Sequence, residues 1–230
     1  MPFFYMDYWY LILVVPTIIL ALIAQVRVSS TFRIFSGYKS KINITAAEVT
    51  RRILDNNGLG SVRVERVSGK LTDHYDPRTN VIRLSDSVYD STSIAAIGVA
   101  AHEAGHAVQH ATNYAPIKIR NSIVPIANFG ASFAPIIIIF GIILSAEPLV
   151  WTGIILYSVI ALFQLVTLPV EFNASGRAVK TLSNMGILDS EEISGAKKVL
   201  SAAALTYVAA LVTTLANLLR FILLARRNDR

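Results

Sequence analysis

Most apolar residues of this chain lie in long blocks without charge. Only the stretch between the first two blocks shows the short apolar-polar repeats that are typical of amphipathic helices and strands. Four blocks contain no acidic or basic residue: residues 8–26, 121–146, 148–170 and 199–219. Each block reaches the ~20 residues that an α-helix needs to cross the hydrocarbon core of a bilayer. The pattern therefore predicts a mainly α-helical membrane protein with about four transmembrane helices.

A polar stretch between the first two blocks shows the shorter periods of a small folded domain. Thr45 and Glu48 have the spacing of a capping box, which predicts the start of a short amphipathic helix. Alternating or extended runs separated by turn residues predict short strands. The strands are expected at residues 62–65, 71–75 and 81–84, and a longer helix at residues 93–110. This stretch is therefore expected to be a small α+β domain.

Composition narrows the class of protein further. Hydrophobic residues make up 53% of the chain and charged residues 16%, against roughly a quarter charged in a soluble domain. The chain has no cysteine, so any metal must be bound by histidine and carboxylate side chains. The net charge is +6, but no basic patch is interleaved with aromatic residues, so we expect a lipid bilayer as partner and no nucleic acid.

The distribution of basic residues predicts an orientation in the membrane. The first 26 residues contain no Lys or Arg, and basic residues follow at Arg27, Arg33, Lys39 and Lys41. By the positive-inside rule this places the polar domain in the cytoplasm, and the lack of a basic n-region indicates a retained anchor. A fourth crossing would carry outward the basic residues Arg226, Arg227 and Arg230. Either the earlier charges dominate, which we favour, or the last block, interrupted by Asn217 and Arg220, is not a full span.

The motif that carries chemistry lies in the helix expected at residues 93–110. It is an HExxH sequence formed by His102, Glu103 and His106. At ~3.6 residues per turn, both histidines fall on one face and can bind one metal ion. Glu103 is rotated by about 100° from His102, which suits a base that takes a proton from an activated water. The motif predicts a zinc centre, against the alternative of a helix that merely carries two histidines.

A third ligand is expected, because zinc in hydrolytic sites usually binds three protein side chains and leaves one position for water. Glu171 is the candidate, since it follows the third block, and a membrane hairpin would return it to the side from which the chain entered. The alternative is an ordinary carboxylate at the end of a span. A site buried within a spanning helix is disfavoured, because only 12 uncharged residues separate Asp90 from Glu103.

Three sequence motifs resemble a known family. HEAGHAVQH, together with DHYDPRTNVIRLSDSVY before it and LPVEFNASGRA after the hairpin, is similar to the YugP-type membrane zinc metallopeptidases. More distantly, the chain resembles HtpX and the CAAX prenyl proteases, in which membrane helices separate the HExxH helix from a downstream glutamate. The resemblance covers nearly the whole chain and implies a zincin-like domain that hydrolyses peptide bonds.

The resemblance also implies roles for individual residues. It makes His102, His106 and Glu171 the zinc ligands and Glu103 the catalytic base. HtpX-type enzymes carry an aspartate four residues after the ligand glutamate, where this chain has Ser175, so either Ser175 or Asn173 is expected to support the site. Four residues are candidates for the group that stabilises the oxyanion: His74, Tyr75, His110 and Arg177. Of these, we assign His74 as a second catalytic residue.

These observations predict a membrane zinc metalloendopeptidase that cleaves membrane-associated polypeptides. An edge strand at residues 80–84 is expected to bind an extended substrate through backbone hydrogen bonds. The main alternative is a zinc-dependent membrane scaffold without proteolysis. It is disfavoured because a purely structural metal site does not need the carboxylate of Glu103 beside the metal. A transporter is disfavoured because the blocks contain no acidic residue. Oligomers or membrane-protein partners are compatible with the sequence.

The expected organisation is read in chain order. It begins with a transmembrane anchor at residues 8–26 and a cytoplasmic domain with the HExxH helix at residues 27–120. A transmembrane hairpin at residues 121–170, a segment carrying the third ligand at residues 171–198 and a C-terminal transmembrane helix at residues 199–224 follow. The zinc site is therefore expected to combine two polar stretches that a membrane hairpin separates.

Overall fold

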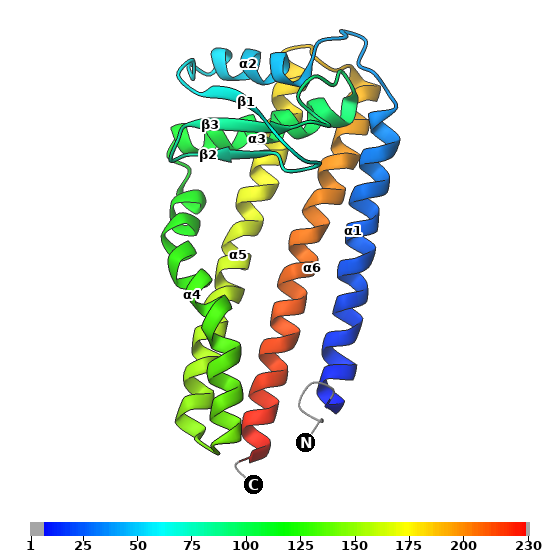
Figure 1. The fold of residues 1–230 in the computed structure, drawn as a ribbon. Coiled ribbons are helices and arrows are strands. Elements are labelled where there is room, and N and C mark those ends of the chain that lie inside the picture. Colours follow the sequence, from blue (N-terminus) through cyan, green and yellow to red (C-terminus); the bar gives the residue numbers. More distant parts are fainter. Residues whose placement is uncertain (1–6, 229–230) are drawn as a thin grey trace. The chain divides into compact units, whose positions relative to one another are not determined.

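The fold is given by a computed structural model, which describes residues 7–228 of the chain. Three short strands and six α-helices make up this part of the chain, with a π-helical stretch before the first helix (Figure 1). In chain order they are η1 (Tyr10–Val14), α1 (Val15–Ser36), α2 (Ala46–Asn56), β1 (Arg63–Val67), β2 (His74–Asp76), β3 (Val81–Ser85), α3 (Ile94–Ala111), α4 (Ala115–Ile143), α5 (Glu147–Asn184) and α6 (Ser190–Asn228). Helices thus dominate, with a small sheet beside them.

Among the described residues, four helices are long and apolar enough to cross a membrane. They are Tyr10–Ser36, Ala115–Ile143, Glu147–Asn184 and Ser190–Arg226. The prediction of a mainly helical membrane protein with a small α+β part is confirmed. Helix α6 continues through Asn217 and Arg220 without a break, so these polar residues do not end the last helix. Arg230 lies outside the described residues.

The segment expected at residues 171–198 consists of the end of one helix, a short connection at residues 185–189 and the start of the next helix. Helix α5 continues from the third apolar block through Glu171 to Asn184, and α6 begins at Ser190. Glu171 is therefore carried by a helix, which holds a side chain in place more firmly than a loop does.

The chain divides into two compact units. The first, called here the membrane unit, comprises residues 7–25, 119–168 and 205–228, and the second, the site unit, comprises residues 26–118 and 169–204. Within the membrane unit, α4 and α5 pack closely through glycines. A Cβ atom on Gly153 would lie 2.5 Å from Cγ1 of Ile138, so a larger residue there would force the two helices apart.

An ion pair within the membrane unit joins the beginning and the end of the described chain. Two guanidinium nitrogens of Arg220, Nη2 and Nε, lie 2.6 and 2.8 Å from Oδ2 of Asp7. Both side chains are largely buried, with exposures of 8% and 14%. A paired arginine is compatible with a membrane helix, whereas an isolated one is costly. The pair thus explains how α6 tolerates a basic residue within its apolar sequence.

The site unit is built around α3. Helix α2 begins with the expected capping box, in which the Thr45 hydroxyl accepts from the Glu48 amide and Glu48 Oε2 accepts from the Thr45 amide. Its apolar face packs against α3, and the strands lie beside the same helix (Figure 1). The buried core combines residues of α2, β3, α3, α5 and α6, among them Ile53, Leu84, Ile97, Leu182 and Leu200.

The sheet has the order β1-β3-β2, with β1 parallel and β2 antiparallel to β3. The prediction that residues 80–84 form the edge strand is therefore wrong, because β3 pairs on both sides and three of its residues, Val81, Ile82 and Leu84, are fully buried. The two edge strands are β1 and the three-residue β2. A proline at Ile82 would break the central strand and could not serve as a test of substrate binding.

Candidate metal centre

Helix α3 presents the two histidines of the HExxH motif on one face. Ser93 caps the helix, since its hydroxyl accepts from the Ala96 amide at 3.2 Å. Four residues apart, His102 and His106 lie one above the other, and their Nε2 atoms are 3.1 Å apart. Neither ring is much exposed, at 15% and 12%. The helix thus brings two nitrogen ligands to one point.

Glu171 of α5 reaches the same point. Its Oε2 lies 3.3 Å from Nε2 of His102 and 3.6 Å from Nε2 of His106. The ligand atoms of the three residues all lie within 4.8 Å of one another. The two helices therefore provide two imidazole nitrogens and one carboxylate oxygen, a donor set that suits zinc.

The charges of this cluster favour a bound cation. The Glu171 side chain is 3% exposed, and no group in the described part of the chain makes a hydrogen bond to its Oε2. Burial acts to lower the pKa of His106, whereas Glu171 and Glu103 act to raise it, and the pKa is raised overall. A buried, unsatisfied carboxylate oxygen is costly, and a divalent cation would compensate it. The residues present therefore fit a metal ion.

The close approach of α3 and α5 depends on Gly105, between the two histidines. A Cβ atom at this position would lie 2.8 Å from the backbone oxygen of Ala174. Backbone thus meets backbone with no side chain between them, and the helices come near enough for Glu171 to reach both imidazoles. A larger residue at position 105 would require the helices to move apart.

A buried glutamine orients His106. Gln109 is completely buried, and its Nε2 donates to the carbonyl of Val170 at 2.8 Å and to Oδ1 of Asn173 at 3.0 Å. Its Oε1 must then be an acceptor, and it lies 3.0 Å from Nδ1 of His106. His106 accordingly carries its proton on Nδ1, which leaves Nε2 free to bind a metal.

The hydroxyl of Ser175 occupies the corresponding place beside His102, 3.1 Å from its Nδ1. The sequence left open whether Ser175 or Asn173 supports the site, and both are in place. Ser175 contacts one histidine directly, and Asn173 reaches the other through Gln109. The role of Gln109 was missed, although its spacing of three residues from His106 on a helix could have indicated it.

Glu103 is held next to the cluster by β2, one of the two edge strands. Its side chain is buried, and Oε2 accepts a hydrogen bond from the backbone amide of Tyr75 at 3.0 Å. Asp73, just before β2, in turn accepts from the amide and hydroxyl of Ser85 at 2.7 and 3.0 Å. Burial raises the pKa of Asp73, and the nearby charge of Glu103 adds to this effect. The segment from Asp73 to Tyr75 thus fixes one oxygen of Glu103.

The remaining candidates lie in different surroundings. His74 is exposed, and its Nδ1 lies 2.8 Å from the carbonyl oxygen of Thr72, so its place in the chemistry stays a prediction. The exposed His110 has its ring centre 6.1 Å from that of Tyr75. Arg177 donates through Nε to Oδ1 of Asn173 at 2.8 Å. The cluster of three ligand residues includes none of these side chains.

Comparison with known proteins places this chain in a family. Residues 10–226 match the family described as "Putative neutral zinc metallopeptidase". The chain is also 49% identical over 201 residues to the "Putative membrane protease YugP" of Bacillus subtilis (strain 168), an alignment that covers 87% of this chain and 89% of the relative. No solved structure gives a significant match. The relative and the four apolar helices identify a membrane protein, and the family match over nearly the whole chain shows that it belongs to these YugP-like zinc metallopeptidases.

Proposed function

We propose that the chain is a membrane zinc metalloendopeptidase in which His102, His106 and Glu171 bind the zinc ion and Glu103 is the general base. The observation that carries this proposal is the convergence of three ligand atoms from two helices within 4.8 Å. Family membership supports zinc and peptide hydrolysis. We propose a gluzincin-like site, and an HExxH helix with a glutamate from a second helix supports this assignment.

His102, His106 and Glu171 would hold the zinc ion, which would supply Lewis-acid chemistry by lowering the pKa of a water molecule and polarising a peptide carbonyl. The protein's own residues then move the proton. Because the amide of Tyr75 binds Oε2 of Glu103, Oε1 is the oxygen that accepts the proton from the attacking water and passes it to the leaving amine. The hydroxyl of Ser175 and the amide of Gln109 keep both imidazoles oriented during these steps.

The edge strand β2 offers a backbone contact for substrate. Tyr75 pairs with Ile82 in the antiparallel register, and its amide is directed to Glu103 and not to β3. In an antiparallel pair the carbonyl of such a residue points to the same outer edge as its amide. The carbonyl of Tyr75 is therefore an acceptor for an amide of an extended polypeptide, and the adjacent His74 is our candidate for binding the oxyanion.

A comparison of Glu103→Gln with wild type tests the proposal. Bound zinc is measured in the purified protein by elemental analysis, and cleavage of casein and of a membrane-protein substrate is followed. We expect the variant to keep its zinc and to lose about 10²–10⁴-fold in turnover, since it cannot accept a proton. Glu191→Gln, an exposed residue of α6, is the matched control. Zinc-loaded wild type without Glu103-dependent cleavage would favour the alternative, a non-proteolytic zinc-dependent scaffold.

We further propose that residues 27–120 and 171–198 face the cytoplasm, so that cleavage takes place at the cytoplasmic membrane surface on membrane-associated polypeptides. The basic residues after the first apolar block support this orientation. Because the chain lacks cysteine, single cysteines introduced at Ser68 and Ser145 can be labelled in intact cells with a membrane-impermeant maleimide. We expect Cys at position 145 to react and Cys at position 68 to react only after lysis. The reverse pattern would invert the topology.

A further inference from the structure

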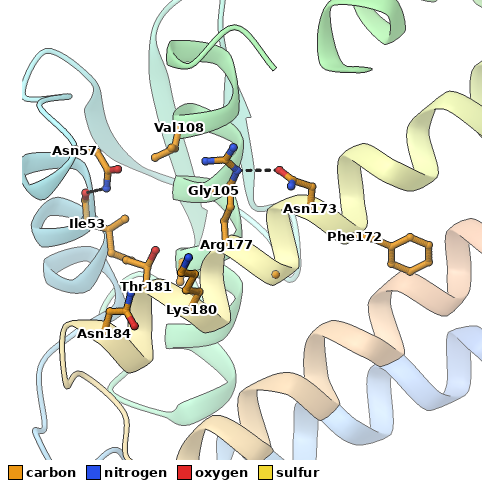
Figure 2. A pocket seen from close by; sticks show the side chains of 12 residues that line it. Ile53, Asn57, Gly105, Val108, Phe172, Asn173, Arg177, Lys180, Thr181 and Asn184 are labelled. Carbon is orange, nitrogen blue, oxygen red and sulfur yellow. Dashed lines mark hydrogen bonds between the residues drawn. The ribbon is translucent and has the colours of Figure 1, made fainter. Parts of the chain in front are cut away.

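A cavity lies in the site unit between α2, α3 and α5, with a volume of about 570 Å³ (Figure 2). Its apolar floor is formed by side chains and backbone of α2 and α3, including Ile53, Gly105 and Val108. Along its α5 side lie Arg177 and Lys180, one helical turn apart. Gly176, on the same helix, would have no atom within 4 Å of an added Cβ, which is consistent with open space at that point.

The charges of this cavity are of one sign. No acidic residue lines it, and within residues 7–228 neither Arg177 nor Lys180 forms an ion pair. Other basic residues of the site unit do have acidic partners, for example Lys41 with Asp189 and Arg51 with Asp55. Two cations left together without a carboxylate favour an anionic ligand.

Neutral donors complete this lining. Oδ1 of Asn173 already accepts from both Gln109 and Arg177, so its Nδ2 is the group left to donate into the cavity. Thr181 and Asn184 add a hydroxyl and an amide on the side facing α2, where Nδ2 of Asn57 donates to the carbonyl of Ile53 (Figure 2). A guanidinium, an ammonium and several neutral donors are the groups that proteins use to bind phosphate.

The position of the cavity along α5 indicates which phosphate it binds. The charge-free block at residues 148–170 ends just before it, and the first lining residue of α5, Phe172, exposes 50% of its surface. An aromatic ring next to the apolar block, followed by two cations, matches a molecule with a hydrocarbon part and an anionic head. We propose that this cavity binds the phosphate group of an anionic phospholipid.

The test uses the full-length protein in nanodiscs of phosphatidylcholine, titrated with fluorescent phosphatidylglycerol. Lys180→Gln removes one cation, and Lys197→Gln, an exposed lysine of α6, makes the same charge change elsewhere in the site unit. We expect the first variant to weaken binding about fivefold to tenfold and the second to leave it unchanged. Gly176→Leu fills the cavity without altering any charge and should weaken binding at least as much as Lys180→Gln.

Each other outcome overturns part of the proposal. Equal effects of the two lysine variants, with none from Gly176→Leu, would mean that lipid is attracted by overall charge and that the cavity is not its site. Competition by millimolar inorganic phosphate, with no preference for phosphatidylglycerol over phosphatidylcholine, would keep a phosphate site but exclude a lipid as its source. Zinc content measured on the same samples separates these results from any failure of the metal centre.

Discussion

The contact between Gly105 and Ala174 makes a quantitative prediction about the metal centre. In Gly105→Ala the new Cβ would lie 2.8 Å from the Ala174 oxygen, whereas an ordinary carbon–oxygen contact is about 3.4 Å, so α3 and α5 must separate by roughly 0.6 Å. A zinc site tolerates deviations of only about 0.2 Å in its ligand distances. We therefore expect zinc affinity to fall at least about tenfold.

The free energy of unfolding of Gly105→Ala should fall, although the higher helix propensity of alanine alone would raise it. Alanine in place of a helical glycine stabilises by about 1 kcal/mol, whereas overpacking costs about 1–3 kcal/mol. The net loss for Gly105→Ala is then at most about 2 kcal/mol, small enough for the protein to remain folded. Loss of zinc binding would accordingly reflect displaced ligands and not unfolding.

Gly176→Ala is the matched control, because it makes the same change on α5 where nothing lies within 4 Å. Its zinc affinity should equal that of wild type, and its Tm should be equal or higher. The measurement is a chelator competition for zinc in detergent, accompanied by thermal unfolding of each zinc-free protein. If Gly105→Ala bound zinc as tightly as Gly176→Ala, the spacing of the two helices would not be what sets the ligand geometry.

Three further predictions concern other contacts. Gln109→Met removes the acceptor for Nδ1 of His106 and should weaken zinc binding about 10–100-fold, as measured by the same competition; unchanged affinity would remove Gln109 from the site. The pKa of Asp73 is raised by burial, so the folded protein binds more protons than the unfolded chain, and this residue favours folding less as the pH rises through that pKa. The Tm of Asp73→Asn minus the Tm of wild type, both measured without zinc, should therefore rise from pH ~4 to pH ~7. A value that falls over this range would contradict the assignment. Arg220→Gln leaves the carboxylate of Asp7 buried without its partner and should cost about 3–5 kcal/mol, whereas the double variant with Asp7→Asn should recover part of the lost Tm; no recovery would show that the two residues act independently.

Local features were predictable from the sequence because they depend on neighbours along the chain. The capping box at Thr45 and the helix that begins after Ser93 are examples, since each rests on side-chain to backbone bonds over three residues. The apolar blocks likewise predicted the four long helices, because the length of a span is set by the bilayer. The helices extend well beyond the blocks, however, as polar residues can continue a helix that packing stabilises.

Features that depend on distant partners were not predictable. The sequence pattern at residues 81–84 correctly predicted a strand. Its parallel pairing with β1 is a long-range contact that the alternation of side chains along one strand does not encode. The prediction therefore made this central strand an edge strand. The bond from the Tyr75 amide to Glu103 could not be foreseen for the same reason. The support from Gln109 depends on Val170 and Asn173, over sixty positions away.

The ion pair between Asp7 and Arg220 has a consequence for how the protein is made. Arg220 follows Asp7 by 213 positions, so the ribosome makes the carboxylate, and three of the four long apolar helices described above, before it makes the arginine. Before the two meet, the charge of Arg220 is not yet balanced by Asp7 and opposes the entry of α6 into lipid. The carboxylate of Asp7 should therefore help the last helix to enter the membrane, and misplacement of the segment around Asp7 should weaken the assembly of the membrane unit.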